Sequence, residues 1–399
     1  MAVVGAGGAG LSLVVALDRL LGDRRRTHPG AAAPSVLLVD PVHRAGADRT
    51  WSFWDDGHSP VEDAVHRSWR RVGVVGRDGV RRVLDLDPMR YVTVRSQDFY
   101  SLADAAADRI GARRLVAPVD AVLDGDRHAL VHAGGRRVRA RWVFDSRPAP
   151  PALPAGTALL QHFRGWAVRA DGPAPMFDPG VPVLMDFGVP QLPREVAFGY
   201  VLPSDAASAL VEFTVFSRAR RTTAAYEHAL RAYLADRYAG HGYTVEAVED
   251  GVIPMTDAVH ARRAGRRVFR LGTAGGATRP STGYTFSAMQ RQAAAVAAAL
   301  LEGREPLPPA PYPARHRWMD AVLLRALDQG HARGDDLFVR LFDRNGPTRV
   351  LRFLDGSTTP AQDLALMASS PTMAMTRAAA GNAAARVRRR AAALRPSVP

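Results

Sequence analysis

A glycine-rich turn close to the start of the chain limits the possible folds more than any other feature. The sequence MAVVGAGGAGLSLVVALDRLL opens with a short apolar strand over residues 1–4 and continues with helical apolar spacing over residues 11–21. Between them lie three glycines in G-x-G-x-x-G spacing, namely Gly5, Gly7 and Gly10. A second apolar strand, residues 36–39, ends in Asp40. This order of elements predicts a Rossmann-like dinucleotide-binding unit.

Each part of this motif has a physical role toward a nucleotide. The first glycine permits a tight turn, the second lets the backbone approach a pyrophosphate, and the third lets the helix pack close to the strand. The free N–H groups of the helix N-terminus bind phosphate, and Asp40 is placed to accept a hydrogen bond from a ribose hydroxyl. The motif alone leaves open whether the nucleotide is FAD or NAD.

A second glycine-rich segment, far along the chain, favours FAD over NAD. In VFRLGTAGGATRPSTGYTF, a strand at residues 268–271 precedes a turn, and an alanine-rich helix is predicted over residues 286–301. Backbone amides in such a turn can hold a second part of one long cofactor. The candidate cofactor residues here are Gly272, Gly275, Gly276, Gly283 and Tyr284, and Asp145 ends a further strand that closes the sheet beside them. The alternative is a plain strand–helix connection.

The predicted fold class is α/β, with a Rossmann-like FAD-binding domain, an inserted β-rich substrate domain and a C-terminal helical segment. A chain of 399 residues is long enough for such a composite. The expected FAD-binding domain is discontinuous and comprises residues 1–60, 90–150 and 250–300. The expected substrate-binding domain comprises residues 61–89 and 151–249, and the helical segment comprises residues 301–399.

Composition narrows the possible partners. The net charge is +14, and all 53 basic residues are arginine, a pattern typical of a GC-rich genome. No basic run is interleaved with aromatic residues as an RNA-binding surface requires, so we expect no nucleic-acid partner. The twelve histidines show no metal-ligand spacing, so we expect no metal. The longest apolar runs fall short of the about 18 residues needed to span a bilayer.

One ionisable side chain lies inside an apolar strand. The stretch LVEFTVFS, residues 210–217, has strand character, and its period of two places Glu212, Thr214 and Phe216 on one face. Burial on that face would disfavour the carboxylate and raise the pKa of Glu212. The alternative is a solvent-exposed strand acid, paired with an arginine such as Arg218.

Ten motifs, in order along nearly the whole chain, resemble those of the FAD-dependent lycopene cyclases of bacteria and plants. They are GAGGAGL, DRTWSFW (48–54), FDSRP, QHFRGW (161–166), LMDF (184–187), FGYVLP, LVEFT, GVIPM (251–255), LGTAGGATRPSTGYTF and VLRFLDG (350–356). The resemblance implies cyclisation of the ψ end groups of lycopene or γ-carotene to β-ionone rings without net redox change. It also implies that the bound FAD works in its reduced form, supplied with electrons by NADPH or another donor.

The resemblance further implies that a protein acid protonates the terminal double bond, and Glu212 occupies the position of that acid. Family members commonly carry a second acid directly after this glutamate, where the present chain has Phe213. Asp186 of LMDF is the nearest candidate to replace it, against the alternative of a turn or capping role. Asp250, before GVIPM, is a weaker candidate.

Two other classes of function are compatible with the same sequence features. An FAD-dependent monooxygenase or reductase acting on a polyene or isoprenoid would use the same scaffold. A nucleotide-holding module without turnover would also fit, although such a module has no need of a buried proton donor. A monooxygenase consumes oxygen and NADPH, a reductase consumes NADPH, and a cyclase consumes neither in each turnover.

A substrate dissolved in lipid requires contact with a membrane surface. We therefore expect a cytoplasmic protein that is peripherally associated with the membrane. In residues 335–356, large apolar residues alternate with arginines that can meet lipid headgroups. The apolar residues of this segment are Leu337, Phe338, Leu341, Phe342, Leu351, Phe353 and Leu354. The alternative is a pair of helices packed on the core.

Overall fold

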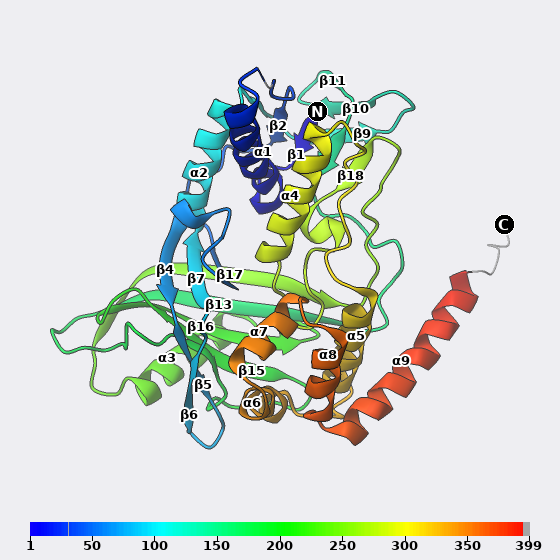
Figure 1. Ribbon diagram of the computed structural model, residues 1–399. Helices are drawn as coiled ribbons and strands as arrows, with labels where there is room; N and C mark the ends of the chain where they lie inside the picture. The colour runs from blue at the N-terminus through cyan, green and yellow to red at the C-terminus, as the bar shows by residue number, and fades with distance from the viewer. Residues whose placement is uncertain (31, 394–399) are drawn as a thin grey trace.

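A five-stranded parallel sheet forms one end of the molecule (Figure 1). The computed structural model describes residues 1–30 and 32–393, and it describes side chains up to residue 385. The strand order is β18-β12-β1-β2-β8, and β1 pairs in parallel with both β2 and β12. The strands are β1 (Ala2–Val4), β2 (Leu37–Asp40), β8 (Arg113–Val116), β12 (Val143–Asp145) and β18 (Val268–Arg270).

Apolar residues cover both faces of this sheet, as the continuous apolar sequences of its strands require. One face packs against three helices, α1 (Gly8–Thr27), α2 (Ser96–Arg109) and α4 (Phe286–Leu301). The other face packs against a small antiparallel sheet of β9 (Val119–Leu123), β10 (Ala129–Ala133) and β11 (Arg136–Ala140). Helix α1 begins earlier than its apolar spacing indicates, because Gly8 and Gly10 already form its first turn.

A seven-stranded sheet crosses the middle of the molecule (Figure 1). Its order is β17-β13-β16-β15-β14-β5-β6, and all neighbours are antiparallel except β14 and β5. The strands are β5 (Arg71–Val75), β6 (Arg81–Asp85), β13 (Ala158–Ala170), β14 (Val183–Asp186), β15 (Val196–Pro203), β16 (Ser208–Ser217) and β17 (Tyr243–Thr256). Helix α3 (Thr223–Arg237) covers one face of β16 and β13.

A third, three-stranded sheet joins the two larger sheets. It has the order β3-β7-β4, with β3 (Thr50–Asp55), β4 (Val65–Trp69) and β7 (Arg90–Arg95). Its side chains contribute both to the core around α1, α2 and α4 and to a cluster around Trp54 and Tyr91 beside the large sheet. The chain therefore passes from one sheet system to the other several times, and strand β17 continues beyond residue 250.

Five helices follow in the C-terminal part (Figure 1). Side chains of α5 to α8 cover the face of the large sheet opposite α3, and α9 packs against α5. They are α5 (Ala314–Asp328), α6 (Gly334–Arg344), α7 (Pro347–Asp355), α8 (Pro360–Ala368) and α9 (Thr372–Ala393). These observations confirm the predicted fold class of a parallel α/β unit, a β-rich part and a helical C-terminal segment.

The apolar side chains of α6 and α7 are placed differently from the expected lipid contact. Leu337, Phe338, Leu341, Phe342 and Leu351 are all buried, and they pack against the large sheet. The two helices are strongly amphipathic, and their apolar faces point to the protein interior because an uncovered sheet face lies there. Of the two readings of this segment, the structure has the helix pair packed on the core. In the part of the chain that the structure describes, no helix is long and apolar enough to span a membrane.

Candidate active site

A cleft of about 460 Å³ lies between the glycine turn at the start of α1 and the large sheet. Its near end is formed by residues 7–9 and residues 281–286, and its far wall by side chains of β13, β15, β16 and β17. Side chains of α6 and α7 close one side, among them Phe338, Phe342 and Leu351. The helices predicted to contact lipid thus line the cleft instead.

The first glycine turn has the close approaches that its motif predicts. Gly5 has a backbone φ of +93°, which residues with a Cβ rarely adopt. A Cβ on Gly10 would lie 2.0 Å from the carbonyl oxygen of Gly5, whereas a Cβ on Gly7 would meet nothing within 4 Å. Gly7 lines the cleft, so backbone at this point is open to a ligand. Asp40 is buried at the end of β2, and its carboxylate accepts a hydrogen bond from the N–H of Ala6 at 2.8 Å.

The second glycine turn packs directly against the first. A Cβ on Gly272 would lie 2.6 Å from the Cβ of Ala9, and a Cβ on Gly275 would lie 2.5 Å from the carbonyl oxygen of Arg270. Gly276 ends the turn with φ +80°. Two segments more than 260 residues apart in sequence therefore form one cradle at the head of the cleft, which fits a dinucleotide cofactor. Gly7, Gly8 and Thr273 of the cradle line the cleft, and the other glycines of the two turns lie behind them.

Gly283 and Tyr284 lie further along the cleft and line it. Gly283 has φ +71°, and a Cβ there would lie 2.4 Å from Oε1 of Gln161 on β13. The ring of Tyr284 packs edge-on against Trp54 with centroids 4.6 Å apart. Burial raises the pKa of the Tyr284 hydroxyl well above its usual range, so it remains a neutral donor.

Asp145 does not line the cleft. Its carboxylate binds the guanidinium of Arg147 through both oxygens, at 3.0 and 2.8 Å, at the end of β12. The next residue, Ser146, lines the cleft, and its hydroxyl donates to the carbonyl oxygens of Val4 and Gly5 at 3.1 Å. The interactions of Asp145 thus hold the end of its strand, next to the first glycine turn.

Glu212 lies in the far wall of the cleft, in the middle of β16. The period of two is as predicted: Glu212, Thr214 and Phe216 line the cleft, and the intervening side chains face α3. Glu212 is only 8% exposed. Arg218, its alternative partner, binds Asp328 instead. Burial, followed by the negative charge of Glu249, raises the pKa of the Glu212 carboxyl well above its usual range.

Glu249 is a second acid in the same wall, and sequence reasoning missed it. Its carboxylate accepts hydrogen bonds from the backbone N–H of Thr50 at 2.9 Å and from the Thr50 hydroxyl at 3.0 Å. Burial raises the pKa of Glu249, while the two Thr50 donors and then the charge of Arg49 act in the opposite direction. In the sequence, Glu249 could have been noticed as the acid directly before Asp250, in the segment that precedes GVIPM.

Asp186 is not brought to Glu212. It is buried on the sheet face that packs against α3, where it accepts from Arg237 Nε at 2.8 Å and Nη2 at 3.0 Å and from the Tyr233 hydroxyl at 3.2 Å. The predicted replacement of the missing second acid by Asp186 is therefore not supported by its position. Its polar contacts join β14 to α3. Asp250, in contrast, lines the cleft, and it forms an ion pair with Arg164 at 2.7 Å.

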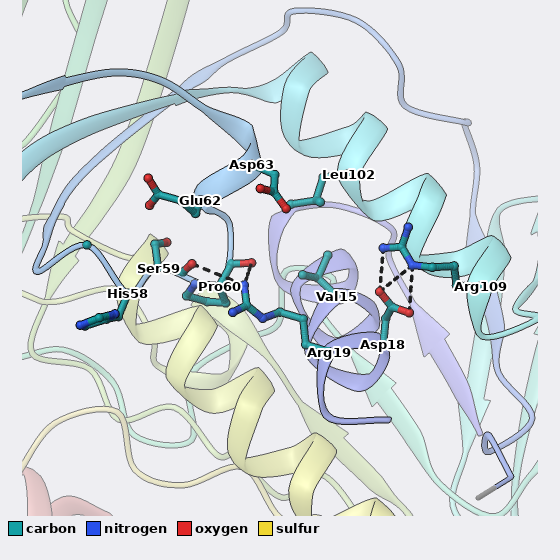
Figure 2. Close-up of a pocket in the computed structure, with 11 residues that line it drawn as sticks. Val15, Asp18, Arg19, His58, Ser59, Pro60, Glu62, Asp63, Leu102 and Arg109 are labelled. Atoms are coloured by element: carbon teal, nitrogen blue, oxygen red, sulfur yellow. Dashed lines mark hydrogen bonds and ion pairs between the residues drawn. The ribbon is translucent and has the colours of Figure 1, made fainter. Parts of the chain in front are cut away.

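A second cavity, of about 440 Å³, lies between α1, α2 and the segment after β3 (Figure 2). Its two arginines bind neighbouring groups: Arg109 binds Asp18 at 2.7 Å, and Arg19 donates to the carbonyl oxygen of Pro60 at 2.8 Å. None of the predicted cofactor or catalytic residues lines this cavity. Among the described residues, no group of three or more His, Asp or Glu side chains is placed to hold a metal ion.

Solved structures share this arrangement of sheets. A geranylgeranyl bacteriochlorophyll reductase-like protein from Thermoplasma acidophilum matches with a TM-score of 0.63 and 14% identity, covering 94% of this chain and 97% of that one. Aklavinone-11 hydroxylase, in a complex with FAD and aklavinone, matches with a TM-score of 0.56 and 16% identity, covering 75% of this chain and 61% of that one. The fold is therefore that of FAD-dependent flavoproteins.

The sequence comparisons narrow this class to one family. The family model described as "Lycopene cyclase protein" matches residues 1–380. A lycopene beta-cyclase from Pseudescherichia vulneris is 28% identical over an alignment of 289 residues, which covers 68% of this chain and 69% of that protein. The chain belongs to the lycopene cyclase family.

Proposed function

We propose that this protein is a lycopene β-cyclase that uses reduced FAD. The observation that carries the proposal is the position of Glu212, a buried acid with a raised pKa in an apolar wall, at the far end of a cleft that begins at the glycine cradle. Protonation of an alkene needs an acid that still holds its proton near neutral pH, and burial provides this property. Family membership supports the substrate class.

The cofactor would be held by the residues of the cradle. We propose that residues 5–10 and the N-terminus of α1 bind the pyrophosphate, that Asp40 orients the ribose end, and that residues 272–276 with Gly283 and Tyr284 border the ring. When bound, reduced FAD would supply negative charge beside the developing carbocation. NADPH or another donor would supply the electrons that keep it reduced.

The protein side chains would carry the proton chemistry. Glu212 donates its proton to the terminal double bond of the ψ end group, and the resulting cation is attacked by a nearby double bond of the same molecule, which closes the ring. Loss of a ring proton then restores a double bond, so the product has the mass of the substrate. The apolar lining from α6 and α7 excludes water from the cation.

An anaerobic assay tests this proposal. Purified protein is incubated with FAD, a chemical reductant and lycopene in liposomes, and products are separated by chromatography and weighed by mass spectrometry. The expected product has unchanged mass and a shortened chromophore, forms only with reduced flavin, and is absent with Glu212→Gln. Glu302→Gln, which alters an exposed acid at the end of α4, is the matched control and should retain activity.

Other outcomes would indicate another member of the flavoprotein class. A product heavier by oxygen would indicate a monooxygenase, and a product heavier by hydrogen would indicate a reductase. Full activity of Glu212→Gln would show that the proton comes from another group. Each of these results would overturn the proposal while leaving the fold and family unchanged.

We also propose peripheral contact with the membrane, at a different place from the one the sequence indicated. Leu364 and Met367 on α8 and Met373 on α9 are 64%, 42% and 79% exposed. Exposed apolar side chains near helix ends can enter the interfacial region of a bilayer. Flotation with anionic vesicles should capture the protein, and the variant Leu364→Ser with Met373→Ser should remain in the soluble fraction. Equal flotation of that variant would refute this location.

A further inference from the structure

We propose that Glu249 is the base that accepts the ring proton, so that the acid and the base of the reaction are two different carboxyl groups. This inference rests on the proposed cyclisation and adds a residue and a role to it. The two groups lie in one wall of the cleft, on strands that do not touch each other, and one glycine separates them.

The sheet register places the two glutamates on either side of Gly165. In the pairing of β13 with β16, Gly165 lies opposite Glu212, and in the pairing of β13 with β17, it lies opposite Glu249. Directly opposed residues point to the same face of a sheet. Adjacent strands are about 4.8 Å apart, so the two Cα atoms are separated by roughly 10 Å, within the combined reach of two glutamate side chains.

Gly165 leaves the space that the two side chains need. A Cβ at this position would lie 2.9 Å from Cγ and 3.6 Å from Cδ of Glu212. The Glu212 side chain therefore lies over the glycine, toward β17 and Glu249. Any larger residue at position 165 would occupy the gap between the two carboxyl groups. A glycine in the middle of a central strand is otherwise unfavourable, because it lacks a side chain for packing.

The surroundings of the two carboxyl groups differ in a way that separates their roles. Glu249 accepts two hydrogen bonds from Thr50, one from a backbone N–H and one from a hydroxyl. Donors of this kind stabilise a carboxylate. Within residues 1–30 and 32–385, the structure records no hydrogen bond to the Glu212 carboxyl. A carboxyl group without donors in an apolar wall keeps its proton, and its hydrogen-bonded neighbour is the one that ionises.

The proton balance closes without any additional reactant. Glu212 gives its proton to the terminal carbon–carbon double bond and becomes a carboxylate. Ring closure forms one carbon–carbon bond and moves the positive charge onto the ring. The Glu249 carboxylate then takes a proton from the ring, whose C–H electron pair becomes the new double bond. Transfer of that proton from Glu249 to Glu212, across Gly165, restores the starting state.

Product analysis of Glu249→Gln tests the role. The expected result is a rate lower by about 100-fold or more, the usual effect of removing a general base, together with an altered product. Without its base, the ring cation loses a proton at another carbon or adds water. The products are then same-mass isomers with a displaced double bond, or a species heavier by one water. A purely structural role of Glu249 would lower the rate without changing the product.

A second variant tests the same role without removing the carboxyl group. Thr50→Val deletes the hydroxyl donor to Glu249 and leaves the backbone donor in place. Loss of one donor should shift the acidic limb of the pH–rate profile upward by up to about one pH unit. Thr244→Val, on the same strand as Glu249 but outside the cleft, deletes the hydroxyl donor to the exposed carboxylate of Asp171. It is the matched control and should leave that limb unchanged.

Two results would overturn the inference. One is an unaltered β-ring product from Glu249→Gln, whether its rate is close to that of the wild type or lower. The other, decisive where Glu249→Gln does not fold, is an unshifted acidic limb in Thr50→Val. Failure of the proposed function itself is distinct, because the wild-type protein would then form no cyclic product from lycopene.

Discussion

The raised pKa of the buried Glu212 carboxyl predicts that Glu212→Gln becomes more stable than the wild type as the pH rises. In the folded protein, burial and the charge of Glu249 raise the pKa of this carboxyl well above its usual range. In the unfolded chain, a glutamate ionises near pH ~4.3. Between these two pKa values, the folded protein binds one more proton than the unfolded chain. The free energy of unfolding of the wild type therefore falls as the pH rises, and Glu212→Gln lacks this loss.

The size of the effect follows from proton linkage. Each pH unit through which the folded protein alone keeps the proton lowers the free energy of unfolding by about 1.4 kcal/mol. Between pH 5 and pH 7, the advantage of Glu212→Gln should thus grow, by at most about 2.7 kcal/mol. For a chain of 399 residues, the unfolding entropy makes 1 kcal/mol equivalent to about 1.2 °C, so the melting temperatures should diverge by up to about 3 °C.

Thermal unfolding across the pH range measures this divergence. Wild type, Glu212→Gln and the exposed control Glu302→Gln are compared at pH 5, 6 and 7 at constant ionic strength. Glu212→Gln should become progressively more stable relative to the wild type, whereas Glu302→Gln should show a constant difference. A constant difference for Glu212→Gln as well would show that Glu212 ionises in the folded protein as it does in the unfolded chain. The argument for a proton-holding acid would then fail.

Three further substitutions test other parts of the structure. Gly10→Ala places a Cβ 2.0 Å from the Gly5 carbonyl oxygen; it should weaken flavin retention by at least about 30-fold, judged from the visible absorbance of the purified protein. Asp186→Asn should lower the free energy of unfolding, measured in urea, by about 2 to 4 kcal/mol. It should leave the rate per bound flavin unchanged, because the ion pair of Asp186 with Arg237 faces α3. A large loss of that rate would restore Asp186 as a candidate proton relay. Asp320→Asn leaves the fully buried Arg279 without its carboxylate, which should cost about 3 to 5 kcal/mol of stability; an unchanged urea midpoint would contradict this.

The sequence predicted those features that depend on local spacing. The glycine turns, the alternation along residues 210–217 and the helix at residues 286–301 follow from periods of 2 and 3.6 and from glycine stereochemistry. The apolar faces of α6 and α7 were equally visible in the sequence, but their partner was not. An amphipathic sequence predicts that a helix has an apolar face. Whether that face contacts lipid or protein depends on where the large sheet lies, which the sequence of the helix does not contain.

The second acid depends on register between distant strands, which no local pattern contains. Glu249 and Glu212 lie on either side of Gly165 because β13 lies between β16 and β17 in the sheet. In the sequence, β14 and β15 separate β13 from β16, and α3 separates β16 from β17. Gly165 was visible in the motif QHFRGW, as a glycine inside an otherwise strand-like run. Its meaning required knowledge of both neighbours.

The same geometry places Phe213 outside the cleft. Successive residues of a strand point to opposite faces, so the residue directly after Glu212 faces α3 and not the cleft. Phe213 is buried there among Tyr226, Leu230 and other apolar side chains, with the Arg221 guanidinium 5.6 Å from its ring centroid. An acid at position 213 would lie beside that arginine, behind the wall of the cleft. A charge partner for Glu212 must instead come from another strand whose side chains face the cleft, and Glu249 on β17, one strand beyond β13, meets this requirement.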